Sequence, residues 1–523
     1  MKFKVVTSIA GLQKNLKNLV VLRKDGWDDW FKYNTMYNVF YYDAGGEETR
    51  IGDVKIGEFD MVADQRRANI PDEFEKLSDA FFSVGQDDSY YQKLNELGDE
   101  FRDEFLAALR DVSKDAELFE RALKEDVTGV SLLRFVSDKS VTGQYRRMTA
   151  GGARLTPYSF TYTPPPWGRG NEPPTFKFKV RPESSPPTNV HVLIGRNGVG
   201  KTHTVNLMTN ALVRPDEGKF GDFVWEETDD FGDALAFPNI ISVTFSAFDP
   251  FEPLPNKENK LSSVRYQYIG LKHVGKDEDG NPKPPKSPDD LAADFGQSVQ
   301  LILTQNAKCE RWRRALTLLE SDRIFKRAEV WQLIDEYRQL MDTSDRREAL
   351  KVLRKSARDL YSKLSSGHKI VLLTITRVVE TLEERSLVLL DEPEAHLHPP
   401  LLSALIRSLS DLLINRNGVA IIATHSPVIL QEVPKSCVWR IRRIGRQAKI
   451  ERPTTETFGE NVGTLTHAIF GLEVTDSGFH KLISDAIDGG LAYDEIVERF
   501  DGKLGDEARG IARSLIATRD DQA

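Results

Sequence analysis

The sequence contains only two cysteines among 523 residues, Cys309 and Cys437. Two thiols cannot build a disulfide framework or a zinc site of four thiolates, so both are expected to be packing residues in a reducing compartment. The chain also lacks an apolar run of about eighteen residues, which a membrane-spanning helix needs. The apolar stretch near the start is too short and too soon interrupted for a secretory signal. These absences predict a cytoplasmic protein with no membrane segment.

An overall basic charge is missing as well. The net charge is −9 and the pI is about 5.7, which argues against a protein that coats nucleic acid. Any contact with DNA would therefore need a local basic patch. The hydrophobic content of 40% and the charged content of 29% are typical of a globular protein. A chain of this length is too long to fold around a single hydrophobic core, so we expect two or three domains.

The central feature of the sequence is a glycine-rich segment, GRNGVGKT. A short apolar run at 191–194 precedes it and predicts a buried strand, and a helix-compatible stretch at 203–212 follows it. Strand, glycine-rich turn and helix is the order that a phosphate-binding loop, or P-loop, requires. The predicted nucleotide-binding residues of this segment are Gly195, Arg196, Asn197, Gly198, Val199, Gly200, Lys201 and Thr202.

The residue types in this segment suit polyphosphate. The glycines let several backbone N–H groups approach the phosphates closely. Lys201 supplies a cation for the β- and γ-phosphates, and the Thr202 hydroxyl is a ligand for Mg²⁺. The helix that begins here directs the positive end of its dipole toward the phosphates. The alternative is an ordinary glycine-rich turn beside a surface lysine, and the flanking strand and helix favour the P-loop.

Three further motifs follow along the chain. Ser365 and Gly367, in the segment LSSGHK, precede an apolar helix, and taken alone they are an ordinary N-cap. An apolar strand at 386–390 ends in Asp391 and Glu392, which places both acids at the ligand-binding edge of a parallel sheet. Asp391 would help to hold Mg²⁺, and Glu392 would polarise the attacking water.

A third strand, at 419–423, is followed by Thr424 and His425. His425 is either a sensor of the γ-phosphate or a structural histidine at a strand end. The order of the four motifs resembles the ABC ATPase family, and the resemblance covers about 189–429. It implies an α/β fold: a P-loop ABC ATPase head with a mixed β-sheet flanked by helices, and a helical subdomain.

The resemblance also implies a mechanism. Two ATP molecules with Mg²⁺ would join a head-to-tail homodimer, in which each P-loop binds ATP in cis and Ser365 with Gly367 acts in trans. Asp391 would serve metal binding, Glu392 and Lys201 catalysis, and His425 γ-phosphate sensing. A higher homo-oligomer fits the same contacts.

One departure from the usual ABC pattern matters. The family presents a glutamine after the strand that follows the P-loop helix, whereas here that place holds 246–249; Asp249 and Gln267 are the substitutes considered, and the role stays unassigned. The aromatic residue that stacks on adenine is also unassigned, with Trp167 and Phe176 as candidates.

The segment DEPEAHLHP resembles a soluble branch of the family that includes OLD-type nucleases, SMC-like repair ATPases and Septu-like anti-phage ATPases. His396 and His398 suggest a metal site, but structure at a dimer interface is the favoured interpretation. The helical stretch between the P-loop and Ser365 is too short for a long coiled-coil arm. No D-x-D motif follows His425, which argues against a nuclease within this chain.

The predicted domain organisation follows from composition. An N-terminal α+β region of unknown role spans 1–162, with strands expected at 3–6, 39–42 and 54–56 and a helical pattern from about 71 to 126. A proline-rich linker is expected at 163–187. The ATPase domain is expected at 188–430, with its helical subdomain at about 291–363, and a strand and helical tail at 431–523.

The function predicted from these motifs is a dimeric ATPase sensor or switch in bacterial anti-phage defence, working with a separately encoded effector, favoured to be a nuclease. The alternative is an ATP-dependent protein that clamps DNA in repair or maintenance. Its contact would be a basic run comprising Arg440, Arg442, Arg443 and Arg446, although a solvated strand edge explains these residues more simply.

Overall fold

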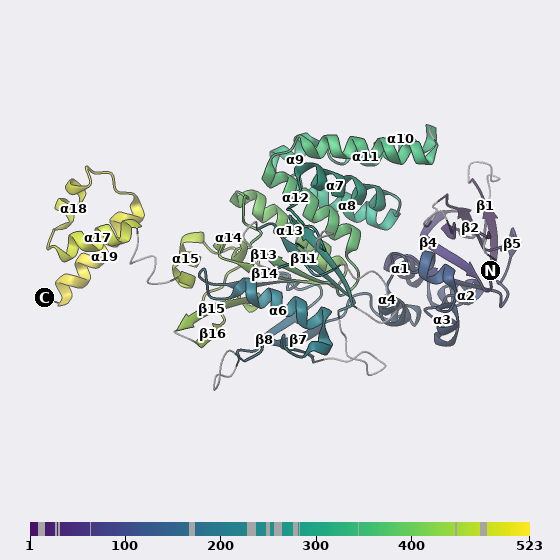
Figure 1. Ribbon diagram of the computed structural model, residues 1–523, viewed down its shortest axis with the longest axis horizontal. Coiled ribbons are helices and arrows are strands. Elements are labelled where there is room, and N and C mark those ends of the chain that lie inside the picture. Colours follow the sequence, from purple (N-terminus) through teal and green to yellow (C-terminus); the bar gives the residue numbers. More distant parts are fainter. Residues whose placement is uncertain are drawn as a thin grey trace.

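The computed structural model describes residues 1–523 except 9–15, 27–28, 30–31, 63, 167–172, 227–236, 247–250, 256–263, 276–280, 282, 344, 445–446, 471–477 and 523. Figure 1 shows an N-terminal domain at one end of the chain's long axis, a central head built on a large sheet, and a small helical unit at the C-terminus. No helix among the described residues is both long and apolar enough to cross a bilayer.

The N-terminal domain is built on a sheet of six strands in the order β5-β1-β2-β3-β4-β6. The strands are β1 (Lys2–Val6), β2 (Leu19–Lys24), β3 (Met36–Tyr42), β4 (Glu48–Glu58), β5 (Glu73–Phe74) and β6 (Phe81–Gly85). Its helices are α1 (Asp88–Glu96), α2 (Asp99–Leu109), α3 (Ala116–Ala122), α4 (Asp138–Ser140) and α5 (Arg146–Thr149), with π-helical turns at Thr128–Leu132 and Val141–Tyr145. Buried apolar residues of both the sheet and the helices form one core.

The helical pattern expected from about 71 to 126 begins later in the structure. Strands β5 and β6 lie in its first part, and the first helix begins only at Asp88. All five residues of β6, FFSVG, are buried. A run that is apolar on both sides cannot be assigned to strand or helix by its periodicity, which explains the error.

The stretch expected to be a proline-rich linker contains strand β8 (Phe176–Val180). This strand pairs with β7 (Tyr158–Thr163), which also pairs with β10 (Asp222–Trp225), in a small antiparallel sheet. The residues of β8 alternate between buried and exposed, as a strand with one packed face requires. The prolines flank this strand and do not interrupt it.

The head contains a sheet of seven strands in the order β12-β11-β13-β14-β9-β15-β16. The strands are β9 (Val190–Ile194), β11 (Asn239–Thr244), β12 (Arg265–Gly270), β13 (Leu387–Asp391), β14 (Val419–Thr424), β15 (Val438–Ile444) and β16 (Gln447–Glu451). The first six in the sheet are parallel, and β16 pairs antiparallel with β15. The register places Thr244 beside Asp391 and Ile194 beside Thr424, so these strands end at the same edge.

Helices cover both faces of the central sheet. On one face, α6 (Lys201–Val213) and the small antiparallel sheet share a core with Leu193, Leu389 and Ile421. The opposite face packs against helices of the helical subdomain and against the two helices that follow it. These are α7 (Pro288–Leu303), α8 (Asn306–Leu319), α9 (Arg323–Ala328), α10 (Gln332–Thr343), α11 (Arg346–Ser362), α12 (Ser366–Thr381) and α13 (Pro399–Asn415).

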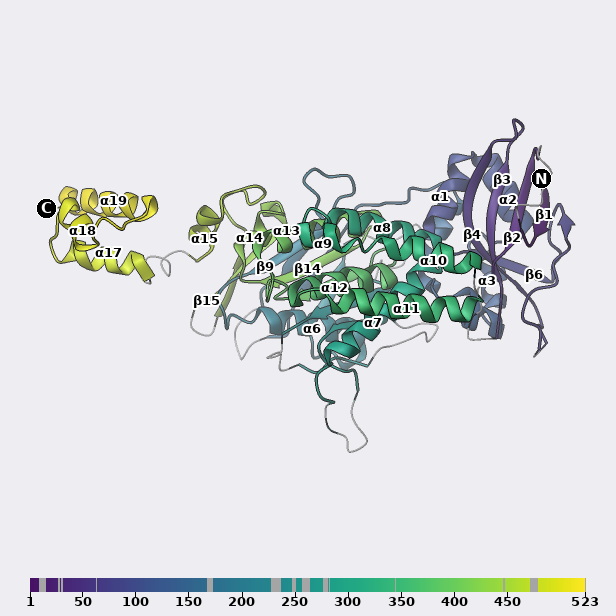
Figure 2. The same cartoon turned by 90° about the horizontal axis from the view of Figure 1, so that it is seen from above.

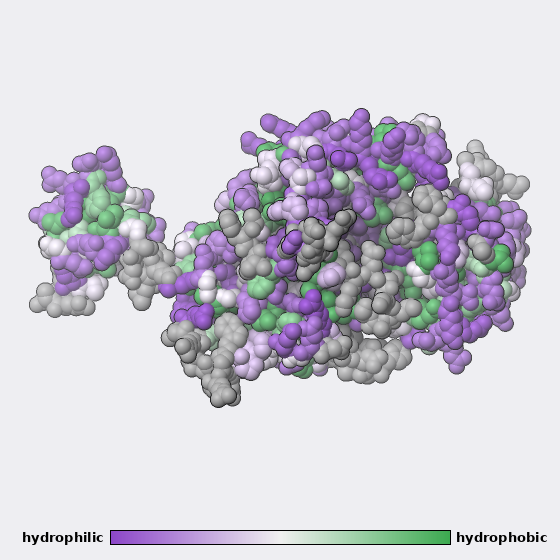
Figure 3. All heavy atoms as spheres, in the orientation of Figure 1, coloured by the Kyte–Doolittle hydropathy of each residue, from purple (hydrophilic) through white to green (hydrophobic). Residues whose placement is uncertain are grey.

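The chain after the head forms α14 (Pro427–Leu430), α15 (Val462–Phe470) and a separate unit of three helices, α17 (Gly478–Asp488), α18 (Tyr493–Arg499) and α19 (Asp506–Gln522). The unit has a small core of its own. Figure 3 shows apolar surface on this unit, where Phe479 and Leu482 are among the exposed apolar side chains. The helical surface over α10 and α11 is mainly hydrophilic in the same view.

The N-terminal domain contacts the head at the amino ends of the central strands. Arg416, in the turn before β14, is buried and pairs with Asp88 and, at 3.5 Å, with Asp87. Arg311 of α8 lies 2.9 Å from Asp87. The Asp87–Asp88 segment therefore joins the N-terminal domain to the head.

A second set of contacts involves the turn between α12 and β13, residues 382–386. Arg147 of the N-terminal domain lies 2.8 Å from Glu384, and the Ser140 hydroxyl donates to Glu383 over 3.1 Å. Both glutamates are largely buried. Figure 2 shows α10 and α11 extending to the same domain, where Arg346 lies 3.8 Å from Asp25. The N-terminal domain thus contacts the end of the sheet opposite the P-loop edge.

Candidate nucleotide-binding site

The P-loop connects β9 to α6, as the sequence predicts. Gly198 and Gly200 have φ values of 80° and 98°, which residues with a side chain rarely adopt. Gly195 is required for a different reason, because a Cβ atom there would lie 2.3 Å from the backbone oxygen of Ile441 in β15. Arg196 and Asn197 are exposed at the tip, and Val199 is buried in the core beneath.

Lys201 folds back over the loop. Its Nζ atom donates to the backbone oxygens of Gly195 and Arg196, each over 3.0 Å, and the residue is 4% exposed. Burial lowers the pKa of this ammonium group, and the nearby carboxylates of Glu392, Glu394 and Asp391 oppose the shift. A cation held in a loop rich in backbone N–H groups is an arrangement that favours a bound polyphosphate.

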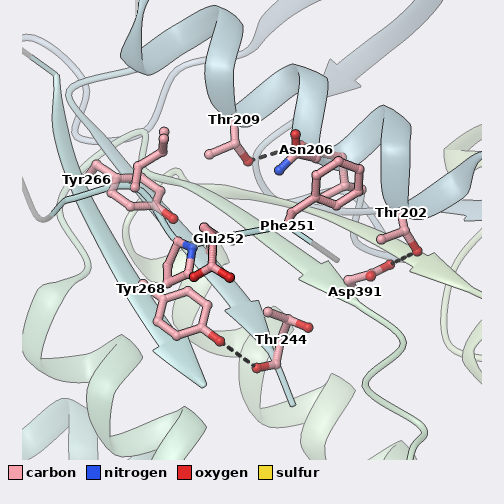
Figure 4. Close-up of a pocket in the computed structure, with 13 residues that line it drawn as sticks. Thr202, Asn206, Thr209, Thr244, Phe251, Glu252, Tyr266, Tyr268 and Asp391 are labelled. Carbon is pink, nitrogen blue, oxygen red and sulfur yellow. Dashed lines mark hydrogen bonds between the residues drawn. The ribbon is translucent and has the colours of Figure 1, made fainter. Parts of the chain in front are cut away.

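Thr202 and Asp391 meet at the same edge. The Thr202 hydroxyl donates to Asp391 Oδ1 over 3.0 Å, although the two residues lie 189 positions apart in the chain (Figure 4). Hydroxyl and carboxylate oxygens are ligands that Mg²⁺ prefers. The pair therefore fits the predicted metal site, with Thr202 on the first turn of α6 and Asp391 at the end of β13.

A pocket extends from this pair between α6, β11 and β12. Figure 4 shows Asn206, Phe251, Glu252 and Tyr268 around it. Gln267, considered as a substitute for the family's glutamine, pairs with Ile241 in mid-strand and does not line the pocket. Asp249, the other substitute, lies outside the described residues.

Neither candidate for stacking on adenine gains support. Trp167 lies outside the described residues. Phe176 is 2% exposed and packs against Phe178 and Trp439, so its ring belongs to the core of the small sheet.

Glu392 and His425 lie close together beyond the ends of β13 and β14. Glu392 adopts a positive φ of 46°, and its N–H donates to Ala423 of β14 over 2.8 Å. His425 Nδ1 lies 3.7 Å from Glu392 Oε1. Both side chains retain solvent access, at 32% for Glu392 and 48% for His425. A carboxylate and an imidazole beside the P-loop edge form a suitable place for an attacking water.

Glu394 is a site residue that the sequence reasoning missed. Its Oε1 atom accepts from the Thr424 hydroxyl over 2.6 Å and from the N–H of His425 over 2.8 Å, and it lies 3.1 Å from His425 Nδ1. The Glu394 side chain is only 9% exposed. The last acid of the DEPE segment was the available signal, since a carboxylate so close to the strand end can reach the neighbouring strand. Glu394 holds the histidine loop in place.

Ser365 and Gly367 lie at the start of α12. Ser365 occupies the N-cap position, but its side chain does not cap the helix and instead bonds His368 Nδ1 over 2.6 Å. Gly367 leaves no room for a side chain, because a Cβ atom would lie 2.7 Å from the backbone oxygen of His396. Among the described residues, no hydrogen bond connects this pair to 195–202.

Two of the four arginines considered for DNA contact, Arg440 and Arg442, are paired with an acid. Arg440, Arg442 and Lys449 each lie within 3.5 Å of Glu451 on β15 and β16. Arg443 is exposed, and Arg446 lies outside the described residues. A separate basic cluster lies at 311–314, where Trp312 is fully buried and its arginine neighbours pair with Asp87, Glu310 and Asp411.

Comparison with known proteins matches part of the chain to a family of AAA domains, which are P-loop ATPases. Residues 297–431, which include Ser365, Asp391, Glu392 and His425, match the family described as "AAA domain, putative AbiEii toxin, Type IV TA system". The whole chain is similar to Protein ea59 of Escherichia phage lambda, with 38% identity over 530 residues that cover all of this chain and 99% of that protein.

Solved structures with similarity to the chain include two ATP-binding cassettes of ABC transporters. One, in its ADP conformation, is 11% identical, covers 62% of this chain and 98% of that chain, and has a TM-score of 0.29. The other, free of nucleotide, is 12% identical, covers 53% and 85%, and has a TM-score of 0.27.

Proposed function

The chain belongs to the family of Protein ea59 of phage lambda, and on this premise we propose that it is an ATP-hydrolysing, dimeric switch of antiviral defence that controls a separately encoded effector. The observation that carries the proposal is the convergence of Lys201, the Thr202–Asp391 pair and the Glu392–His425 pair at one edge of a parallel sheet. Each is a group that phosphoryl transfer uses, and ligands bind at this edge of such sheets.

The chemistry follows from the positions of these groups. Lys201 and the loop N–H groups bind the β- and γ-phosphates, and Thr202 with Asp391 would hold Mg²⁺, which supplies positive charge to the transferred phosphoryl group. Glu392 accepts a proton from the attacking water. His425, held by Glu394, contacts the γ-phosphate and loses that contact after hydrolysis.

Dimerisation supplies the second half of each site. Ser365 and Gly367 have no hydrogen bond to their own P-loop among the described residues, so a head-to-tail partner is the arrangement in which they contact nucleotide. ATP then binds the closed dimer more tightly than the open one, and hydrolysis reverses the difference. The description of the matching family as a toxin of a toxin–antitoxin system supports a role in defence.

The first prediction tests nucleotide-dependent assembly. Wild-type protein should become dimeric or larger when ATP and Mg²⁺ are added, and Lys201→Ala should stay in its nucleotide-free state because the buried cation for the phosphates is gone. Light scattering coupled to size-exclusion chromatography measures the mass. Nucleotide affinity should fall by about tenfold or more, which corresponds to one lost charge-assisted contact of about 1.5–3 kcal/mol.

The same samples test the effector and the DNA alternative. Products of neighbouring genes are added, and a nuclease-like protein should join the complex only with ATP. A mass that does not respond to ATP would remove the dimer mechanism. Tight binding to random duplex DNA that weakens steeply with salt, without recruitment of a protein, would favour the clamp instead.

A second prediction concerns Glu394. Glu394→Ala should lower the rate of ATP hydrolysis by roughly 10–100-fold, the range typical of groups that orient a reactive side chain. Nucleotide affinity should change little, because Glu394 contacts the histidine loop and not the P-loop. Steady-state ATPase assays and a fluorescent nucleotide titration separate the two quantities. Glu432→Ala, which removes the acid partner of Arg407 on α13, is the matched control. An equal loss in both variants would mean that Glu394 has no specific role.

A further inference from the structure

The structure brings together three side chains that the proposed ATPase chemistry does not use, Asp322, His368 and His398. His368 Nε2 lies 3.0 Å from Asp322 Oδ1, and His398 Nε2 lies 3.7 Å from Asp322 Oδ2. The potential ligand atoms of the three residues all lie within 4.8 Å of one another. From this geometry we propose that Asp322, His368 and His398 bind a divalent transition-metal ion of the zinc class.

The distance between His398 and Asp322 fits a shared ion better than direct contact. At 3.7 Å, His398 Nε2 is too far from the carboxylate for a hydrogen bond. Two ligand atoms that each lie about 2.1 Å from one tetrahedral ion are separated by about 3.4 Å. The observed separations of 3.0 and 3.7 Å lie on either side of that value. Two imidazoles and one carboxylate are also the donor set of zinc sites that keep an open position.

Two of the three ligands are buried, and hydrogen bonds to Asp322 hold its carboxylate in place. His368 and Asp322 are enclosed, with side chains 4% and 11% exposed, whereas His398 is 52% exposed and leaves an entry path. Asp322 Oδ1 also accepts from the N–H groups of Ile324 and Phe325, which fixes the carboxylate at the start of α9. Such bonds to the ligands orient them and raise metal affinity.

The ligands come from three different elements. Asp322 caps α9 of the helical subdomain, His368 lies in the first turn of α12, and His398 is the N-cap of α13. Asp322 and His368 lie 46 positions apart in the chain, so the sequence alone does not indicate this cluster. The pair considered there, His396 with His398, is not part of one site, because His396 is absent from the cluster.

Binding of an ion changes the hydrogen bond at Ser365. Without metal, the carboxylate can only accept, so His368 carries its proton on Nε2 and its Nδ1 accepts the Ser365 hydroxyl. With metal on Nε2, the same proton sits on Nδ1 and donates to Ser365 Oγ. The serine O–H is then available to an acceptor outside the chain. This consequence rests on the proposed function, in which Ser365 contacts the nucleotide bound by the partner.

One existing bond opposes metal binding. His398 Nδ1 accepts from the N–H of Leu401 over 3.3 Å, and a metal on Nε2 moves the ring proton to Nδ1 and breaks this bond. The bond is long, and the ring is exposed and able to turn. Ion binding therefore exchanges one weak N-cap bond of α13 for metal ligation.

The test is a titration of the full-length, chelator-treated protein with Zn²⁺ by calorimetry, and with Co²⁺ by visible absorption, which reports tetrahedral ligation. We expect one ion per chain, and at least tenfold weaker binding in Asp322→Asn and in His398→Ala. His396→Ala removes an exposed histidine two positions away and should bind like the wild type. Circular dichroism of each variant checks that it is folded.

Two outcomes would overturn the site. The first is equal affinity in His398→Ala and the wild type, and the second is weak binding of several ions to surface histidines only. A nucleotide experiment tests the effect on Ser365. Zn²⁺ should strengthen the ATP-dependent dimer of the wild type and not that of His398→Ala. If Zn²⁺ acts equally on both dimers, the effect on Ser365 is refuted. Lys201→Ala should still bind Zn²⁺, so a failed ATP switch and a failed metal site give different results.

Discussion

Replacing Glu392 by glutamine is expected to lower the rate of ATP hydrolysis by about 10²–10⁴-fold while ATP binding is retained. Glutamine has nearly the same shape and can still hydrogen bond the attacking water, but it cannot accept its proton. The backbone of this residue, with its positive φ and its bond to Ala423, does not depend on the side chain. The Thr202–Asp391 pair and the P-loop are therefore kept.

The effect of Glu392→Gln on dimer formation is more informative than its effect on the rate. With hydrolysis blocked, ATP and Mg²⁺ should accumulate the closed dimer, which light scattering detects as a doubled mass that persists for hours. Glu348→Gln, an exposed residue on α11, is the control and should turn over ATP like the wild type. Wild-type turnover in Glu392→Gln would show that another group is the base. Glu394, which also lies beside His425, would then be the nearest alternative.

Arg416→Ala is expected to destabilise the protein by about 3–5 kcal/mol, because it removes the nearest cation of the buried Asp88 carboxylate and one of the two arginines beside Asp87. Arg416 is 4% exposed and pairs with Asp88 and Asp87, so water cannot replace the lost charge. Burial raises the pKa of Asp88 to about 6 from 3.8, although Arg416 acts in the opposite direction. Removing Arg416 raises that pKa further.

The sign of the pH dependence follows from this shift. A folded-state pKa above the unfolded value means that the folded protein binds more protons, so protonation of Asp88 stabilises it as the pH falls toward 4. The loss in free energy of unfolding caused by Arg416→Ala should therefore be larger at pH 8 than at pH 5. Urea unfolding of the variant and the wild type at both pH values measures this loss.

The control for this variant is Arg313→Ala. Arg313 has a side chain that is 61% exposed and pairs with Glu310 one helical turn away, so its loss should change the free energy of unfolding by about 0.5 kcal/mol or less. Equal stability of Arg416→Ala and the wild type would show that the domain contact at Asp87 and Asp88 is not formed in solution.

Local pattern explains which parts of this fold the sequence predicts. The strands before Gly195, Asp391 and Thr424 are short apolar runs followed by polar residues, and parallel strands bring those residues to one edge. The Thr202–Asp391 contact follows from that rule. Strand β6 was missed because a run buried on both sides has no period, and β8 because the prolines around it dominate the composition.

The sequence does not predict the contacts between residues that lie far apart in the chain, and the reason is a different one. Asp88 and Arg416 lie 328 positions apart, and neither belongs to a motif that calls for a partner. Ser365 suggests a helix cap, which is the commonest use of such a serine, but the hydroxyl bonds His368 because that imidazole lies in the next turn. Only the three-dimensional arrangement decides between such partners.

The turn at 382–386 has a mechanical consequence. It ends α12, whose other end begins beside Ser365, and it begins β13, whose last residue is Asp391. The N-terminal domain contacts this turn through Arg147 and Ser140. A displacement of the turn would therefore shift α12 and β13 together, so in the proposed dimer a ligand of the N-terminal domain would alter Ser365 and Asp391 in a single movement.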